Sequence, residues 1–221
     1  LSMFNEDLLQ RVFSFLSLQE ITSSLCVVSP ALKQGCAQCV RYLSIQAPAK
    51  TSYPCILLFL QQATQLNHLT FKNCIHLTWE HLRRLDSFAN HWFLLKYEIL
   101  GCMQLVRNDI ELSHPLFPKQ LKHLAIQCCC LGQKQLDKIV LPNHLESLNL
   151  SYNNILTRDN IFAKQTLCCL KELDLSFNHM LVDSTINNLP GTIETLILAG
   201  NLPITDLSSI HWPPKLLNLD L

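Results

Sequence analysis

The chain has 221 residues, of which 48% are hydrophobic, and this is enough apolar surface for one or two domains with a packed core. Its 17 basic and 17 acidic residues give a formal net charge of zero, which argues against nucleic acid and anionic membrane as partners. Only five glycines are present, and no low-complexity tract is seen, so the composition also argues against disorder.

The eleven cysteines are odd in number and lack paired spacing, so we expect free thiols in a reducing compartment, the cytoplasm and/or the nucleus. Cys36 and Cys39 form a lone C-x-x-C pair without a second pair at zinc spacing. Cys128, Cys129 and Cys130 cannot all bind one tetrahedral metal, because neighbouring side chains on a strand point to opposite faces. We therefore expect no metal site and no cofactor.

The first forty residues are expected to form three short helices. Asn5 is a candidate N-cap followed by acids in the first turn, where the helix dipole favours them. Residues 17–20 form a capping box that opens a second helix, and Ser29 before Pro30 opens a third. Helices this short cannot bury a core alone, so they need the rest of the chain, a partner, or both.

From residue 40 onward, an apolar triplet of the form Leu-x-x-Leu-x-Leu recurs every 23 to 28 residues. Its clearest copies are residues 145–150 and 170–175. Each triplet predicts a strand whose apolar side chains point inward and whose intervening residues point outward. The second apolar residue of successive copies is Leu69, Tyr97, Leu124, Leu148, Leu173, Leu196 and Leu219, and a degenerate copy precedes them at Leu43.

An Asn or Cys follows most triplets by three residues, where a buried side chain can donate to backbone carbonyls of the neighbouring coil. These residues are Cys74, Cys102, Cys129, Asn153, Asn178 and Asn201. In several units a short helix is expected to return the chain to the next strand. The candidates are residues 78–85, with Thr78 as N-cap, and residues 133–140 and 183–189, which end before prolines.

Residues 66–221 resemble leucine-rich repeats, with Cys-type units first and Asn-type units later. The resemblance implies an α/β solenoid, in which a curved parallel sheet is backed by a helical or irregular convex side and preceded by a small all-α domain. We assign residues 1–40 to the helical domain and residues 41–221 to about seven repeats. The last triplet ends at Leu221 before its Asn, so we expect that unit to be incomplete and the chain to be a fragment.

Residues 3–36 resemble an F-box, and an F-box directly before leucine-rich repeats is the order of a known family. The resemblance implies docking on the Skp adaptor of a cullin-type (SCF) ubiquitin ligase. The family commonly has Leu-Pro where this chain has Met3 and Phe4, and often has Trp where it has Leu32. The residues implied to contact the adaptor are Met3, Phe4, Leu8, Leu9, Val12, Phe13, Leu16 and Ile21.

The outward-pointing strand residues are expected to line the concave face, where a protein substrate would bind. Basic residues dominate the early strands and acidic residues the late ones, so a partner with the opposite gradient could be steered into register. Charges that merely solvate the surface are an equally weighted interpretation. The candidate substrate-binding residues are His68, Thr70, Lys96, Glu98, His123, Gln127, Asn149, Ser151, Glu172, Asp174, Thr195 and Ile197.

No phosphate loop, nucleophile motif or calcium loop is found, and we expect a non-catalytic protein. The leading hypothesis is a substrate-recognition adaptor that binds Skp, through it a cullin, and a protein substrate. The alternative is a leucine-rich-repeat scaffold that acts without a ligase. An extracellular receptor is disfavoured by the unpaired cysteines and by the acids near the start of the chain, and the apolar run 55–60 is too short to span a membrane.

Overall fold

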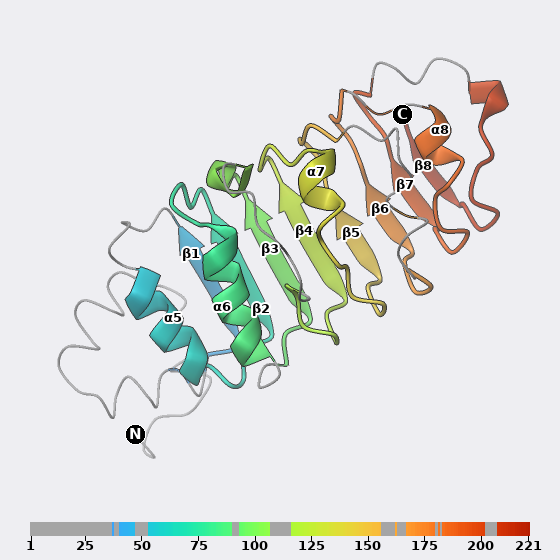
Figure 1. Ribbon diagram of the computed structural model, residues 1–221. Coiled ribbons are helices and arrows are strands. Elements are labelled where there is room, and N and C mark those ends of the chain that lie inside the picture. The colour runs from blue at the N-terminus through green and yellow to red at the C-terminus, as the bar shows by residue number, and fades with distance from the viewer. Residues whose placement is uncertain are drawn as a thin grey trace.

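The computed structural model describes residues 37, 40–46, 53–89, 93–106, 116–155, 162, 167–179, 181, 183–201 and 207–221. Within these ranges, eight strands form one parallel sheet whose order in space is their order in the sequence (Figure 1). The strands are β1 (Tyr42–Gln46), β2 (His68–Lys72), β3 (Lys96–Leu100), β4 (His123–Gln127), β5 (Ser147–Asn149), β6 (Glu172–Asp174), β7 (Thr195–Ile197) and β8 (Asn218–Asp220).

The strands are aligned on the second apolar residue of each triplet. Leu43 of the degenerate copy is the partner of Leu69, which in turn is the partner of Tyr97. The series then continues through the predicted residues to Leu219. The predicted repeat spacing is confirmed, and the fold of the described residues is a leucine-rich-repeat solenoid, in which each coil pairs with its neighbours.

Alternation along the strands separates the core from a face of the sheet that none of the described helices covers. In β3, Tyr97 and Ile99 are buried, whereas Lys96, Glu98 and Leu100 are partly exposed. The helices lie together on one side of the sheet, and the core fills the space between (Figure 1). We call the opposite side the open face. The helices are α5 (Tyr53–Gln62), α6 (Trp79–Ala89), α7 (Gln133–Leu136) and α8 (Asp183–Ile186), with 3-10 helices at Met103–Val106 and Leu207–Ser209.

The helix α5 was not predicted, although its sequence carries a helical pattern. Tyr53, Ile56, Leu60 and Ala63 are all buried, and they recur at intervals of three and four residues. The Tyr53 ring stacks on the His81 ring of α6, with centroids 4.5 Å apart. The apolar run that was too short for a membrane therefore lies within a helix, where Ile56, Phe59 and Leu60 are buried and Leu58 is exposed.

The three helices predicted between the repeat strands all form, but two of them are shorter than expected. The segment 78–85 becomes α6, which extends to residue 89. The segments 133–140 and 183–189 contain only the four-residue helices α7 and α8, each followed by turns. So short a helix gains few hydrogen bonds after its costly first turn, so tertiary contacts decide where it ends.

The side chain of Asn153 joins three neighbouring stretches of buried backbone. Its Nδ2 donates to the carbonyl oxygens of Ile126 at 2.7 Å and Leu150 at 2.8 Å. Its Oδ1 accepts from the backbone N–H groups of Cys129 at 3.1 Å and Leu131 at 3.0 Å. One amide thus satisfies backbone groups of its own coil and of the preceding one, which a buried turn would otherwise leave unpaired.

Two later asparagines and three earlier cysteines extend this ladder, as predicted. Each donates to a backbone carbonyl oxygen of the preceding coil, at distances from 3.0 to 3.8 Å. A thiol is the weaker donor, but it is small and apolar enough for the same buried position. The five residues are Cys74, Cys102, Cys129, Asn178 and Asn201.

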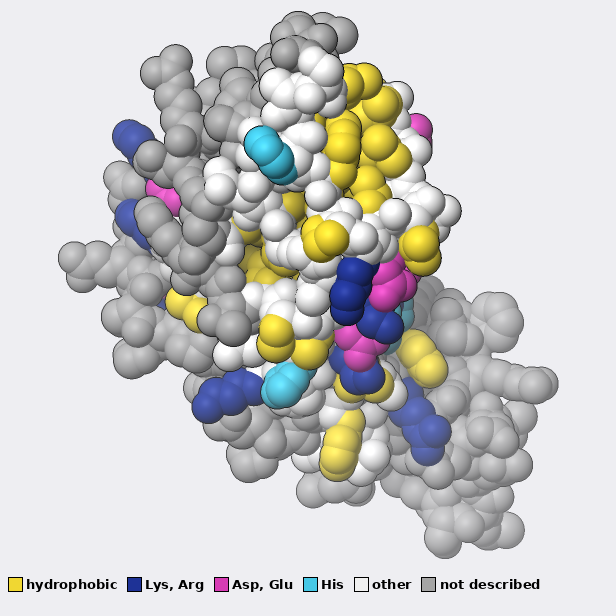
Figure 2. All heavy atoms as spheres, turned by 90° about the vertical axis from the view of Figure 1, so that its right-hand side faces the viewer, with side chains coloured by type: hydrophobic (Ala, Val, Ile, Leu, Met, Phe, Trp, Pro, Cys, Tyr) yellow, Lys and Arg dark blue, Asp and Glu magenta, His cyan; other side chains and the backbone are white. Residues whose placement is uncertain are grey.

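A second series of hydrogen bonds joins the coils where the strands begin. The carbonyl oxygen of Lys122 accepts from the N–H groups of residues 146 and 147, at 2.8 and 3.0 Å, and later coils repeat the pattern. Lys122, Glu146, Lys171 and Glu194 occupy this position in four successive coils, so their charges alternate. Lys122 Nζ lies 2.7 Å from Glu146 Oε1. We call these four residues the charged row; Figure 2 shows basic and acidic side chains side by side on the molecule.

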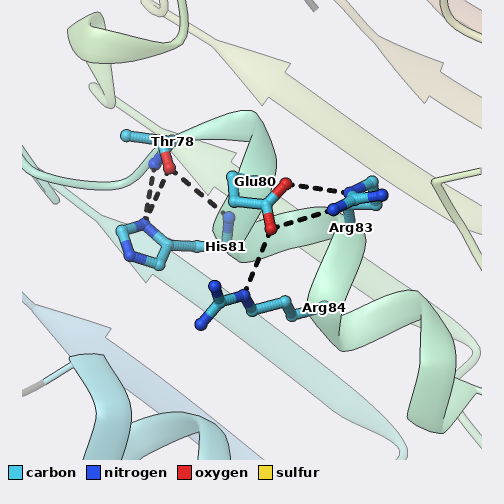
Figure 3. Close-up of polar contacts among 5 residues, drawn as sticks. All are labelled: Thr78, Glu80, His81, Arg83 and Arg84. Carbon is cyan, nitrogen blue, oxygen red and sulfur yellow. Dashed lines mark hydrogen bonds and ion pairs between the residues drawn. The ribbon is translucent and has the colours of Figure 1, made fainter. Parts of the chain in front are cut away.

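The helix α6 begins with a capping box in which histidine replaces the usual Glu or Gln (Figure 3). The Nδ1 atom of His81 accepts from the backbone N–H of Thr78 at 3.2 Å, and Thr78 Oγ1 accepts from the backbone N–H of His81 at 3.4 Å. On the same turn, Glu80 accepts from Arg83 at 2.8 Å and from Arg84 at 3.2 Å. The backbone N–H groups of Thr78 and His81, at the start of the helix, therefore both have side-chain acceptors.

Asn153→Ala should destabilise the fold by about 3–5 kcal/mol, because several buried backbone groups lose their partners. Asn154→Ala is the matched control, since Asn154 is exposed, and it should change the free energy of unfolding by about 0.5 kcal/mol or less. Urea denaturation of the three proteins measures the difference. Equal stabilities for the two variants would contradict the role of the ladder.

Acidification should weaken the cap of α6, because a proton on His81 Nδ1 removes the acceptor for the Thr78 N–H. Burial lowers the pKa of His81, Arg84 lowers it further, and Glu80 opposes them. The stability from the neutral ring is therefore present above about pH 6.5 and is lost as the pH falls toward the lower folded-state pKa. His81→Gln keeps an acceptor that does not titrate. Denaturation midpoints at about pH 7.5 and 5.5 should fall less in this variant than in the parent protein.

Candidate functional site

The residues predicted to bind a substrate all lie on the open face or at the ends of its strands. Ten of the twelve are at least partly exposed. The other two, Thr70 and Ser151, are 8% and 1% exposed, so they have little surface for direct contact with a partner. Their side chains instead form hydrogen bonds to the exposed residues of the face. The candidates are not gathered into one pocket. Most of them fall into two hydrogen-bonded groups, and their role in binding stays a prediction.

The first group, which we call the Glu98 cluster, consists of His68, Thr70, Lys96 and Glu98 on β2 and β3. Glu98 Oε2 accepts from Thr70 Oγ1 at 2.8 Å and lies 3.0 Å from His68 Nε2. Lys96 Nζ lies 2.9 Å from Glu98 Oε1. Because a carboxylate stands between the two bases, this end of the open face is not the plain basic surface that the early strands suggested.

The contacts of Glu98 lower the pKa of its carboxyl group. Burial is the largest single influence and would raise the pKa, but the hydrogen bonds from Lys96, His68 and Thr70 together outweigh it. They lower the pKa of Glu98 to about 2. The carboxylate is thus charged at neutral pH, and it is already bonded to residues of its own protein.

The second group, the Asp174 network, crosses β4, β5 and β6. Gln127 donates to Ser151 Oγ at 2.9 Å, and Ser151 Oγ donates to Asn149 Oδ1 at 2.7 Å. Asn149 Nδ2 and Ser176 Oγ then donate to the two oxygens of Asp174, each at 2.7 Å. All these donors are neutral, and no Lys or Arg of the described ranges forms an ion pair with Asp174. The network fixes the carboxylate and leaves its charge available.

A recurrent backbone feature at the strand ends was missed by sequence reasoning. Six coils place the fourth residue after the register position in the left-handed region, with φ between 52° and 73°. Gly and Asn adopt this conformation readily, but bulky residues rarely do. Aligning the repeats on their leucines would have shown two glycines at this position. The six residues are Asn73, Gly101, Cys128, Tyr152, Phe177 and Gly200.

The two bulky residues in this series form an exposed aromatic pair. The rings of Tyr152 and Phe177 stack with centroids 4.4 Å apart and planes 12° apart. Tyr152 is 54% exposed and Phe177 is 37% exposed. A Cβ atom on Gly200 would lie 2.7 Å from the Phe177 ring, so glycine in the next coil leaves the space that this ring occupies. The pair adds an apolar surface to the edge of the Asp174 network.

The residues predicted to contact the Skp adaptor lie outside the described residues, so that interaction stays a prediction. The same holds for the three helices expected in the first forty residues and for Cys36 and Cys39. The adaptor residues concerned are Met3, Phe4, Leu8, Leu9, Val12, Phe13, Leu16 and Ile21.

The cysteines whose side chains the structure describes form no disulfide. Cys128, Cys129 and Cys130 were expected on a strand, but they follow β4 in a turn, in which Cys128 is exposed and Cys129 is buried. In the part of the chain with assigned positions, no group of three or more His, Cys, Asp or Glu residues could hold a metal ion. None of the helices found there has the length and hydropathy needed to span a membrane.

Comparison with known proteins yields only distant likenesses. No protein-family model matches the chain, and no curated protein sequence matches it. The chain is similar to the crystal structure of a TLR13–ssRNA13 complex, with a TM-score of 0.49 and 20% identity over 75% of this chain and 26% of that one. It is also similar to the Drosophila Toll–Spatzle complex, with a TM-score of 0.37 and 11% identity over 71% and 27%. It spans about a quarter of either protein.

Glu98→Gln should remove an acid-sensitive part of the stability. A carboxylate whose folded-state pKa is lowered to about 2 stabilises the fold above its ordinary pKa of about 4.3, and the effect is lost as the pH falls between these values. The difference in free energy of unfolding between parent and variant should therefore shrink from about pH 5 to about pH 2.5. Thr195→Val, at a partly exposed residue of the same face that does not titrate, is the control and should show a constant difference. A constant difference for Glu98→Gln as well would contradict the cluster.

Proposed function

We propose that this chain is a non-catalytic, protein-binding leucine-rich-repeat module whose open face is the binding surface. The observation that carries the proposal is an uncovered parallel sheet with polar side chains that are already ordered by the Glu98 cluster and the Asp174 network. Side chains held by such bonds lose less conformational entropy on binding, which favours recognition of a partner. The face offers carboxylates, amides, hydroxyls and aromatic rings, which together suit a polypeptide.

The more specific proposal is a substrate-recognition adaptor of a cullin-type ubiquitin ligase, acting in the cytoplasm and/or the nucleus. Its support is the resemblance of residues 3–36 to an F-box and their position directly before the repeats. In this proposal the Skp adaptor binds the helical segment and the open face binds a substrate. Lysines of the substrate are then held at a high effective concentration near a ubiquitin-charged enzyme. A repeat scaffold without a ligase is the alternative, and it needs only the open face.

Purified Skp adaptor should be retained by the intact chain at micromolar concentrations, and Leu9→Ala should reduce the retention. If Leu9 faces the adaptor, the variant keeps its thermal midpoint; if Leu9 is a core residue, it loses about 2–5 kcal/mol of stability as well. Leu58→Ala, at an exposed leucine of α5, is the matched control and should bind like the parent. Failure of the intact chain to retain the adaptor would refute the ligase proposal and leave the scaffold.

A further inference from the structure

The two ends of the open face differ in how their carboxylates are compensated. Glu98 is paired with Lys96 and His68, as described above. Glu172, Asp174 and Asp220, on β6 and β8, form no ion pair with a Lys or Arg within the described ranges. Since the whole chain has a formal net charge of zero, the negative character of this end is local.

The cation nearest in sequence to Glu172 and Asp174 belongs to another part of the surface. Lys171 directly precedes β6, but it belongs to the charged row, between Glu146 and Glu194. It is among the groups that lower the pKa of Glu146. The open face of β5 to β8 therefore presents carboxylates, together with neutral groups such as Asn149 and Thr195, toward any partner.

The aromatic pair lies at the ends of these same strands. Tyr152 follows β5 and Phe177 follows β6, each in a left-handed conformation that is costly for a bulky residue. Other coils use Asn73 or Gly101 at this position, so the fold does not require a ring there. Exposed, stacked rings beside uncompensated carboxylates form the surface that a guanidinium or ammonium group prefers, because it can pair with the acid and pack on the ring.

We infer that the β5–β8 end of the open face, with the Tyr152–Phe177 pair, binds a basic, extended segment of a protein partner. The inference rests on the proposed function, since it specifies the partner of the open face. Asp174 and Asp220 are aligned through Ile197, two strand spacings apart, which is roughly 10 Å. Alternate residues of an extended segment lie about 7 Å apart on the same face, so two long basic side chains at such positions can spread far enough to reach both carboxylates. Phosphate groups would be repelled, which disfavours nucleic acid here.

A fluorescein-labelled decapeptide of alternating Arg and Ser is the probe, and fluorescence anisotropy with the full chain is the readout. We expect it to bind with an affinity that falls as salt is added. The matching Glu-Ser peptide and a single-stranded oligo-U RNA of ten nucleotides should not bind. Binding of the RNA in preference to the Arg-Ser peptide would overturn the inference.

Two double variants test the residues without endangering the fold. Tyr152→Asn with Phe177→Asn places in both coils the residue that Asn73 already shows to be compatible. Glu172→Gln with Asp220→Asn changes two exposed side chains. Each should weaken peptide binding by about tenfold and leave the thermal midpoint unchanged or higher. The matched controls are Phe93→Asn, at an exposed ring between α6 and β3, and Glu80→Gln, on α6; both should bind like the parent.

The outcomes separate this inference from the function on which it rests. A chain that retains the Skp adaptor but does not bind the peptide overturns the inference alone. Peptide binding that is lost in the two double variants and kept in the controls supports the inference, even when Skp is not retained. Equal binding by the double variants and the controls overturns it, because attraction to this surface would then be absent.

Discussion

The structure depends on one constraint, which is that the turn after each strand is buried and its backbone groups must still find hydrogen-bond partners. Asn153 meets it with a single amide that donates and accepts at once, within its coil and toward the preceding one. The side chain therefore fixes the distance between coils as well as the shape of each turn. A cysteine is only a weak donor and a weak acceptor there, yet three successive coils use one, and Cys129 Sγ also accepts from the Cys102 N–H at 3.4 Å. The repeat spacing, the straight register of the leucines and the left-handed residue before each ladder position follow from this arrangement.

The open face is a consequence of the same constraint. Once the turns align the strands, alternation sends every second side chain away from the core, and equivalent positions of neighbouring coils meet laterally. At β2 and β3, Glu98 contacts Lys96 of its own strand and His68 and Thr70 of the neighbouring one, so its charge is compensated within the protein. At β5 and β6 the equivalent positions carry amides and hydroxyls, so Asp174 is held without being neutralised. Two surfaces of different character thus arise on one sheet from the residues that happen to be neighbours.

The repeat register, the ladder residues and the start of α6 could be predicted from the sequence, because each depends on a local pattern that recurs. Contacts between coils were harder. His68 and Glu98 lie thirty residues apart, and the order of the residues along the chain gave no sign of the contact between them. The stacking of Tyr152 on Phe177 also needs two coils to be laid side by side. Even so, both pairs could have been found by writing the repeats beneath one another. Tyr152 and Phe177 then stand in one column, and Glu98 stands two positions along from the column of His68.

The charged row constrains the number of coils. Lys122, Glu146, Lys171 and Glu194 alternate because each stands one coil from the next. Deleting the coil of Glu146 or of Lys171, or duplicating any one of the four coils, would place like charges together, whereas removing both inner coils would keep the alternation. Each contact between like charges costs little at an exposed site. Whether such a contact forms depends on whether the number of coils gained or lost is odd or even. We therefore expect coils in this region to be gained or lost with the least cost in pairs.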